Sequence, residues 1–145
     1  MNQKAEEFKK YLDEKKIEGV FAIEEVKGDD EWQTVLFRSQ VDINGNKLPT
    51  VVIFDKSVYG LLRVLIAPQV LRDENETAVL KLINDYNKKY KAFKYYVDDA
   101  GALVLDVCMI AADGKDAGDM VYAMFDVIMQ HLGESYKDIM KSVWG

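Results

Sequence analysis

The sequence predicts an α+β fold, an antiparallel sheet of about six strands with helices packed on it, in the order α-β-β-β-β-α-β-β-α. Three observations lead to this prediction. Apolar residues recur at helical spacing only near the start, the middle and the end of the chain. Runs rich in β-branched residues are grouped between these helices instead of alternating with them, which is typical of antiparallel sheets. No repeat or linker divides the 145 residues, so we expect one domain over residues 1–145.

The first half of the chain is predicted to hold one helix and four strands. Phe8, Tyr11 and Leu12 share one face of a helix over residues 4–16, which Gly19 ends. The strands are expected at residues 20–26, 32–39, 51–55 and 58–67. Gly28, Asp29 and Asp30 form a turn after the first of them.

Two glycines in this region carry a specific expectation. Gly45 follows Asn44, and this pair predicts a two-residue hairpin turn because both residue types tolerate a positive φ. Gly60 lies inside the fourth predicted strand, where a glycine indicates a bulge or a close approach of another group.

The second half is predicted to hold two helices around a second hairpin. Asp73 stands three residues before Glu76, which predicts a capping box at the start of a helix over residues 74–89. Strands are expected at residues 93–97 and 102–110. The last helix carries one apolar stripe, and we expect Gly133 to break or kink it. The stripe consists of Met120, Val121, Met124, Phe125, Ile128 and Leu132.

Composition excludes several classes of function. Hydrophobic residues make up 49% and charged residues 30%, as in ordinary globular domains. The net charge of -6 disfavours nucleic acid and anionic lipid as partners. No stretch is apolar enough to span a bilayer and the start lacks a leader, so a cytoplasmic protein is expected. The single cysteine, Cys108, cannot form an internal disulfide.

No residue pattern points to catalysis, to a metal or to a cofactor. His131 is the only histidine, and we expect it to be a structural residue of the last helix. Cys108 is expected to be a buried, inert thiol in an apolar strand. Asp98 and Asp99, and the acidic stretch over residues 113–119, suggest a calcium site but are interpreted as turns, and the second stretch lacks the ligand order and the terminal glutamate of a calcium loop. Glycines near residue 114 match neither a dinucleotide fingerprint nor a phosphate loop.

Some predicted strands are apolar on both faces. In the last hairpin, Leu103, Leu105 and Val107 share one side, while Val104 and Cys108 share the other. A helix that crosses the second face, or a curled sheet, would explain this pattern. Alternatively, a second copy or a protein client covers part of that face. The candidate binding surface comprises Val104, Cys108, Ile110, Tyr59, Leu61 and Leu65, with Met129 added from the last helix.

From Leu61 onward, the chain resembles the YbjN-like family, whose fold is similar to that of type III secretion chaperones (Tir chaperone-like proteins). The resemblance rests on LLRVLIAP at residues 61–68, LKLINDYNKKY at 80–90, FKYYVDDAG at 93–101, ALVLDVCMI at 102–110 and a long amphipathic last helix. It implies a compact α+β protein, often homodimeric, that binds other proteins. The last helix departs from the chaperones, because it is rich in tyrosine, methionine and valine where they carry leucine.

Together, these observations predict a non-catalytic protein-binding module, chaperone-like or regulatory, that acts as a homodimer and binds a protein client. The alternative is a small-ligand sensor with a pocket between sheet and helices, for which Trp32, Tyr95 and Tyr96 are the candidate lining residues. A small enzyme whose catalytic groups meet only on folding is the third possibility.

Overall fold

A computed structural model describes residues 1–28, 30–111 and 113–145 of the chain. Asp29, in the turn predicted after the first strand, lies outside the described residues. The same is true of Ala112, at the start of the glycine-rich stretch before the last helix.

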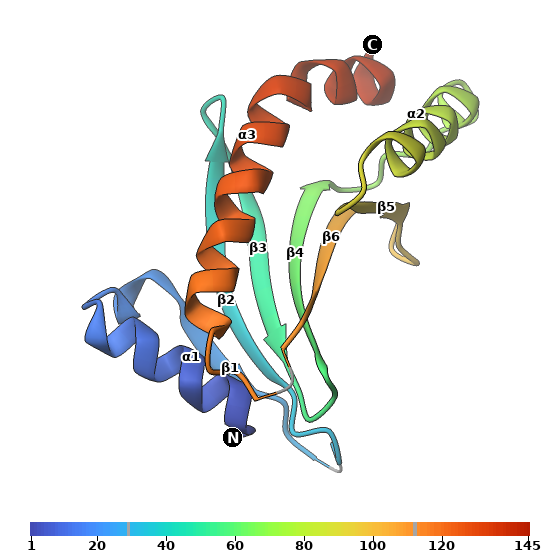
Figure 1. The fold of residues 1–145 in the computed structure, drawn as a ribbon. Coiled ribbons are helices and arrows are strands. Elements are labelled where there is room, and N and C mark those ends of the chain that lie inside the picture. The colour runs from blue at the N-terminus through green and yellow to red at the C-terminus, as the bar shows by residue number, and fades with distance from the viewer. Residues whose placement is uncertain (29, 112) are drawn as a thin grey trace.

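The structure confirms the α+β fold and the predicted order of its elements (Figure 1). Six strands form one antiparallel sheet in the order β1-β2-β3-β4-β6-β5. Besides a short 3₁₀ helix, η1 (Glu18–Val20), the elements are α1 (Gln3–Glu14), β1 (Ala22–Glu25), β2 (Val35–Ile43), β3 (Asn46–Phe54), β4 (Tyr59–Ala67), α2 (Glu76–Lys89), β5 (Lys94–Val97), β6 (Leu103–Ile110) and α3 (Ala117–Trp144).

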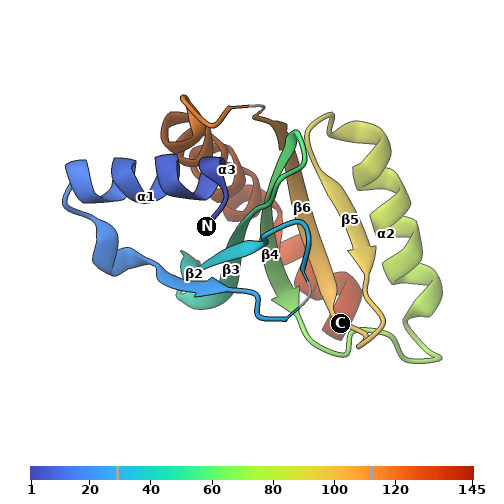
Figure 2. The same ribbon diagram turned by 90° about the horizontal axis from the view of Figure 1, so that it is seen from below.

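The helices pack on one face of the sheet, and the hydrophobic core lies between them and that face. Figure 2 shows α1 and α3 above the sheet and α2 alongside β5. Phe8 of α1 sits at the centre of an aromatic cluster, with its ring centroid 4.8 Å from that of Phe37, 5.5 Å from Phe21 and 5.7 Å from Phe54. These edge-to-face contacts fix α1 over β2 and β3.

Two polar side chains at the start of the chain fasten α1 to the sheet. The side chain of Asn2 accepts a hydrogen bond from the Ala5 amide (2.9 Å) and donates to the carbonyls of Gln33 (2.7 Å) and Phe54 (2.9 Å). The buried ammonium of Lys4 donates to the carbonyls of Ser57 and Tyr59. Burial lowers the pKa of Lys4, and the nearby Asp55 carboxylate opposes that shift.

The predicted capping box at Asp73 and Glu76 does not form, because Asn75 is the residue before the first turn of α2. Its amide nitrogen donates to the carbonyls of Val70 (2.6 Å) and Val143 (2.9 Å). Arg72 donates to the same Val143 carbonyl (2.8 Å). The start of α2 and the end of α3 are therefore joined through side chains, which local spacing in the sequence does not reveal.

Several predicted boundaries need correction. The second and third strands extend to Ile43 and Asn46 and pair up to the turn, so polar residues expected in a loop belong to strands. Asn44 and Gly45 have φ values of 52° and 83°, as the hairpin prediction requires. The chain before β1 forms η1 instead of extending the strand to Val20.

The predictions for two further glycines have opposite outcomes. A Cβ on Gly60 would lie 2.6 Å from the Phe54 ring, which confirms the expected close approach, while the irregularity in β4 falls between Leu65 and Ala67. Gly133 does not break α3, which is helical from Ala117 to Trp144, although Figure 1 shows its axis bending in the C-terminal part.

Substitution of Gly118 by alanine is expected to destabilise the fold by about 1 to 3 kcal/mol, because the new Cβ would overpack a tight helix contact. That Cβ would lie 2.1 Å from Cγ of Tyr11, where α1 crosses α3. Gly133→Ala is the matched control in the same helix, since its Cβ meets nothing within 4 Å. The control should stabilise the protein by about 1 kcal/mol. Urea denaturation measures both, and equal stabilisation by the two variants would contradict the tight α1–α3 contact.

Candidate functional site

The second face of the sheet carries no helix in the described part of the chain, and we call it the open face (Figure 2). Side chains alternate between the core and this face along each strand. Ile110 on β6 is 73% exposed and Tyr59 on β4 is 53% exposed. The other apolar members are half-buried and comprise Leu36, Val51, Ile53, Leu61 and Leu65. Such a contiguous apolar surface is uncommon on a monomer.

Strand register aligns these side chains into rows across the open face. Leu36 pairs with Ile53, Ile53 with Leu61, and Leu61 with Cys108. The result is one apolar row that crosses four strands, from β2 to β6. Side chains directly opposite each other in an antiparallel sheet are close enough to form a continuous surface.

The next row is mainly charged. In it, Arg38, Val51, Arg63 and Asp106 lie opposite one another on successive strands. Arg63 donates to both carboxylate oxygens of Asp106, at 2.8 and 3.1 Å, and the Tyr96 hydroxyl donates to one of them at 2.9 Å. Asp106 is only 5% exposed, so these bonds compensate the loss of its hydration. The hydrogen bonds to Asp106 raise the pKa of Arg63.

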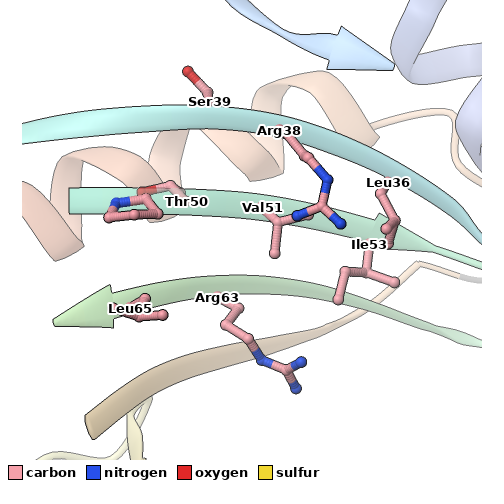
Figure 3. Close-up of a pocket in the computed structure, with 9 residues that line it drawn as sticks. Leu36, Arg38, Ser39, Thr50, Val51, Ile53, Arg63 and Leu65 are labelled. Carbon is pink, nitrogen blue, oxygen red and sulfur yellow. The ribbon is translucent and has the colours of Figure 1, made fainter. Parts of the chain in front are cut away.

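A hollow of about 390 Å³ lies on the open face over β2, β3 and β4 (Figure 3). Figure 3 shows Arg38 reaching from β2 towards Val51, whereas the Arg63 guanidinium points away towards β6. Among the described residues, Arg38 is held by one exposed ion pair, with Glu24 at 3.1 Å, and such pairs contribute little. No acidic side chain of the described residues lines the hollow, whose other lining residues are Leu36, Ser39, Pro49, Thr50, Ile53 and Leu65.

The structure brings most of the predicted surface residues together. Tyr59, Leu61, Leu65, Cys108 and Ile110 all lie on the open face of β4 and β6.

Two others are not part of the accessible open face. Val104 points to this side of β6 but is 2% exposed, so it offers almost no contact area. Met129 lies on α3, on the helix side of the sheet. The thiol of Cys108 is exposed, which corrects the expectation of a buried cysteine: no helix covers its side of the strand.

Sequence reasoning missed the part of the open face contributed by β2 and β3. Leu36 and Arg38 alternate with the buried Phe37, and Val51 and Ile53 alternate with the buried Val52. The signal was present in the hairpin turn, because a two-residue turn at Asn44 and Gly45 fixes which residues of the two strands are opposite each other.

His131 belongs to a buried aromatic cluster between α2, α3 and β5. Its ring centroid lies 4.4 Å from those of both Tyr90 and Phe93, and its Nε2 is hydrogen-bonded to the Tyr95 hydroxyl. Burial raises the pKa of Tyr95, so this hydroxyl keeps its proton. The other ring nitrogen, Nδ1, faces the Ser135 hydroxyl at 3.5 Å. This arrangement agrees with the predicted structural role.

The other chemical candidates also have structural explanations. Asp98 accepts hydrogen bonds from the amides of Ala100 (3.0 Å) and Ala102 (2.9 Å), and Asp113 accepts one from Lys115 (3.1 Å), as acidic turn residues do. Within residues 1–28, 30–111 and 113–145, no three His, Cys, Asp or Glu side chains converge as a metal site would need. Nor is any helix of these residues sufficiently long and apolar to traverse a bilayer.

The three aromatic residues expected to line a ligand pocket do not share one. Tyr95 is 1% exposed within the core, and Tyr96 points to the open face on the other side of β5. Trp32 is 51% exposed in the loop before β2. The hollow described above lies on the open face, and a pocket of about 290 Å³ on the helix side, between β2 and α3, is lined by none of these three residues.

Acidification is expected to destabilise the protein through His131. Burial lowers the pKa of His131 from 6.5 to about 4, with Lys89 adding to the shift and Glu134 opposing it. The unfolded chain therefore takes up this proton near pH 6.5, but the folded chain only near pH 4. The free energy of unfolding should fall by about 3 kcal/mol as the pH drops through this window.

Urea denaturation at a series of pH values measures this loss. The groups that face the imidazole are Tyr86, Lys89, Tyr90, Phe93, Tyr95, Glu134 and Ser135. The variant His131→Gln, which cannot take up the proton, should lose less stability over the same window. An equal loss in both proteins would assign the effect to other groups.

Comparison of the chain with models of protein families gives no match, and comparison with characterised proteins gives none either. The resemblance to the YbjN-like family therefore stays a prediction. What this chain binds has to follow from the geometry of its own surface.

Proposed function

We propose that this protein is a non-catalytic binding module, chaperone-like or regulatory, which engages a protein client through the open face. The observation that carries the proposal is the apolar row of Leu36, Ile53, Leu61 and Cys108, extended by the exposed Ile110. Exposed apolar patches rimmed by polar residues are typical of protein interaction sites.

The open face also carries the features that give an interface specificity. Its apolar row lies beside a charged row in which the pair of Arg63 and Asp106 is already satisfied within the chain. Arg38 forms an exposed pair with Glu24, which it can exchange for another partner at little cost. The matching client surface therefore has apolar side chains opposite the apolar row and a carboxylate opposite Arg38.

The proposal includes a homodimer and a cytoplasmic location. Both follow from expectations drawn from the sequence, namely the resemblance to a frequently dimeric family and the charge and cysteine content of the chain. In a homodimer, a second copy occupies one surface while the client occupies the open face.

A second candidate function is the binding of a small apolar anion in the hollow. Its volume of about 390 Å³ falls in the range of small-molecule sites, its floor is apolar, and Arg38 reaches over it. A medium-chain fatty acid is a suitable probe of this chemistry.

The client is expected to touch Cys108, which is the only cysteine and is exposed on the open face. A photo-crosslinker attached to this thiol should form an adduct with the client in a lysate. The control carries the same label at Val127→Cys in a Cys108→Ser background, because Val127 is 50% exposed on α3. Loss of an apolar contact in Ile110→Asp should lower the adduct yield at Cys108 about tenfold. Equal yields from both labelled sites would contradict binding through the open face.

Thermal unfolding with the fatty acid as probe tests the small-ligand function separately from the binding of a protein client. Binding in the hollow should raise the Tm of the wild-type protein. Val51→Lys should abolish that rise, since it places a long polar side chain in the hollow. Ile110→Asp should retain it, because Ile110 does not line the hollow. A rise that is unaffected by Val51→Lys would exclude the hollow as the binding site.

A further inference from the structure

The outer edge of β2 is only partly covered by β1. The pairing of these strands runs from Glu25 opposite Val35 to Ala22 opposite Arg38 and ends there, because the chain before β1 turns away in η1. β2 itself continues to Ile43. Figure 1 shows the hairpin between β2 and β3 projecting beyond β1, beside α3. The last part of β2 is therefore a sheet edge.

Register determines which main-chain groups point outwards at this edge. The bond from the Val26 amide to the Thr34 carbonyl (3.0 Å) shows that Thr34, and hence Leu36 and Arg38, direct their main-chain groups towards β1. By the same alternation, the N–H and C=O groups of Gln40 and Asp42 point outwards. No strand of the described chain pairs with them. They form a short template for an added strand.

A pocket of about 290 Å³ adjoins this edge on the helix side of the sheet. Val41, between the two outward-pointing residues, turns its side chain to this side. The apolar lining comes from three elements and consists of Val20, Phe21, Val41, Tyr122, Phe125 and Met129. Val20 is 51% exposed and Met129 is 38% exposed, so the pocket is accessible from solvent. One large apolar side chain fits such a space.

The charged residues that line this pocket are acidic. They are Asp126 of α3 and Asp42 of β2, whose side chain points to the open face because it alternates with Val41, and no Lys, Arg or His of the described residues lines the pocket. Neither carboxylate forms a salt bridge with another described residue. Asp42 accepts a local hydrogen bond from the Gly45 amide (2.9 Å), and Lys47 lies opposite it on β3. A segment that carries a basic side chain is therefore favoured over an acidic one.

We propose that an extended segment of a basic partner protein adds to the edge of β2 at Gln40 and Asp42, with one large apolar side chain in the adjoining pocket. The added strand lies in line with β1 and antiparallel to β2. Its basic residue stands opposite Asp42, and the next residue along the partner, opposite Val41, is the apolar one. Main-chain bonds supply general affinity, and these two side chains supply selectivity.

The opposite edge of the sheet is covered at Tyr95. On β5, the Asn87 side chain donates to the Tyr95 carbonyl (3.0 Å) and accepts from the Tyr95 amide (2.8 Å). An amide group from α2 thus takes the place of a neighbouring strand on that edge. The β2 edge has no such cover in the described residues, and it is where strand addition remains sterically open.

The test uses the full chain and a labelled synthetic peptide of about seven residues. The peptide has a Lys-Phe pair at its centre and threonine at alternating positions on either side. Fluorescence anisotropy should detect binding, and hydrogen exchange by NMR should show new protection of the Gln40 and Asp42 amides. Gln40→Pro removes the outward N–H and should weaken binding about tenfold. Gln40→Thr is the matched control, since it keeps the N–H and the strand, and should bind as the wild type does.

The contribution of the Asp42 charge is tested separately from that of the main-chain hydrogen bonds. Asp42→Asn retains an acceptor for the Gly45 amide but loses the negative charge, so it should bind the Lys-Phe peptide several-fold more weakly than the wild type does. The variant should bind a Gln-Phe peptide as the wild type does. Ile110→Asp on the open face should leave peptide binding unchanged. Failure of strand addition at β2 can therefore be distinguished from failure of client binding at the open face.

Three outcomes would overturn the proposal. One is equal binding of a peptide that is N-methylated at the positions opposite Gln40 and Asp42. Another is equal binding to Gln40→Pro and Gln40→Thr. The third is a free protein that is dimeric with the Gln40 and Asp42 amides already protected, which would make a second copy the occupant of this edge.

Discussion

The two-residue turn at Asn44 and Gly45 is the constraint on which the arrangement of this surface depends. It pairs Ile43 with Asn46, and this pairing sets the register of β2 and β3 along their whole length. Because side chains alternate with a period of two, a slip of β3 by one residue against β2 would turn Val52 to solvent and Ile53 into the core while Phe37 stayed buried. The same register decides that Gln40 and Asp42 direct their main-chain groups outwards. Both binding surfaces proposed for this protein therefore originate in one turn.

The order of the elements could be predicted because each depends on local signals. Helical spacing identified α1, α2 and α3, and runs of β-branched residues identified the strands. The ends were less predictable, since tertiary contacts decide them. Asn75 begins α2 in place of Asp73 because its amide is bonded to Val143, far along the chain. Trp32 was assigned to a strand by its residue type, but the strand begins only at Val35, where pairing with β1 and β3 starts.

The candidate site was predictable only in part. A strand that is apolar on both sides reveals a second contact surface, and this signal located Cys108 and Ile110 on β6. The contribution of Leu36, Val51 and Ile53 needed the alignment of separate strands, which composition does not provide. The exposure of individual side chains was even harder to predict. Val104 and Cys108 look alike in sequence, yet Val104 is 2% exposed and Cys108 is exposed, because Val104 has neighbours on both β4 and β5 whereas Cys108 pairs only with β4 among the described strands.

The segment between β4 and α2 links parts of the chain that are distant in sequence. The Val70 amide donates to the Gly101 carbonyl at 2.9 Å, and the Asn75 amide group donates to the Val143 carbonyl. One short segment thus holds the turn of the second hairpin and the last turn of α3 together. Fraying of the C-terminal turn would break the bonds that Arg72 and Asn75 donate to the Val143 carbonyl, at the start of α2. The end of this helix should therefore open as part of a larger cooperative unit instead of unwinding residue by residue.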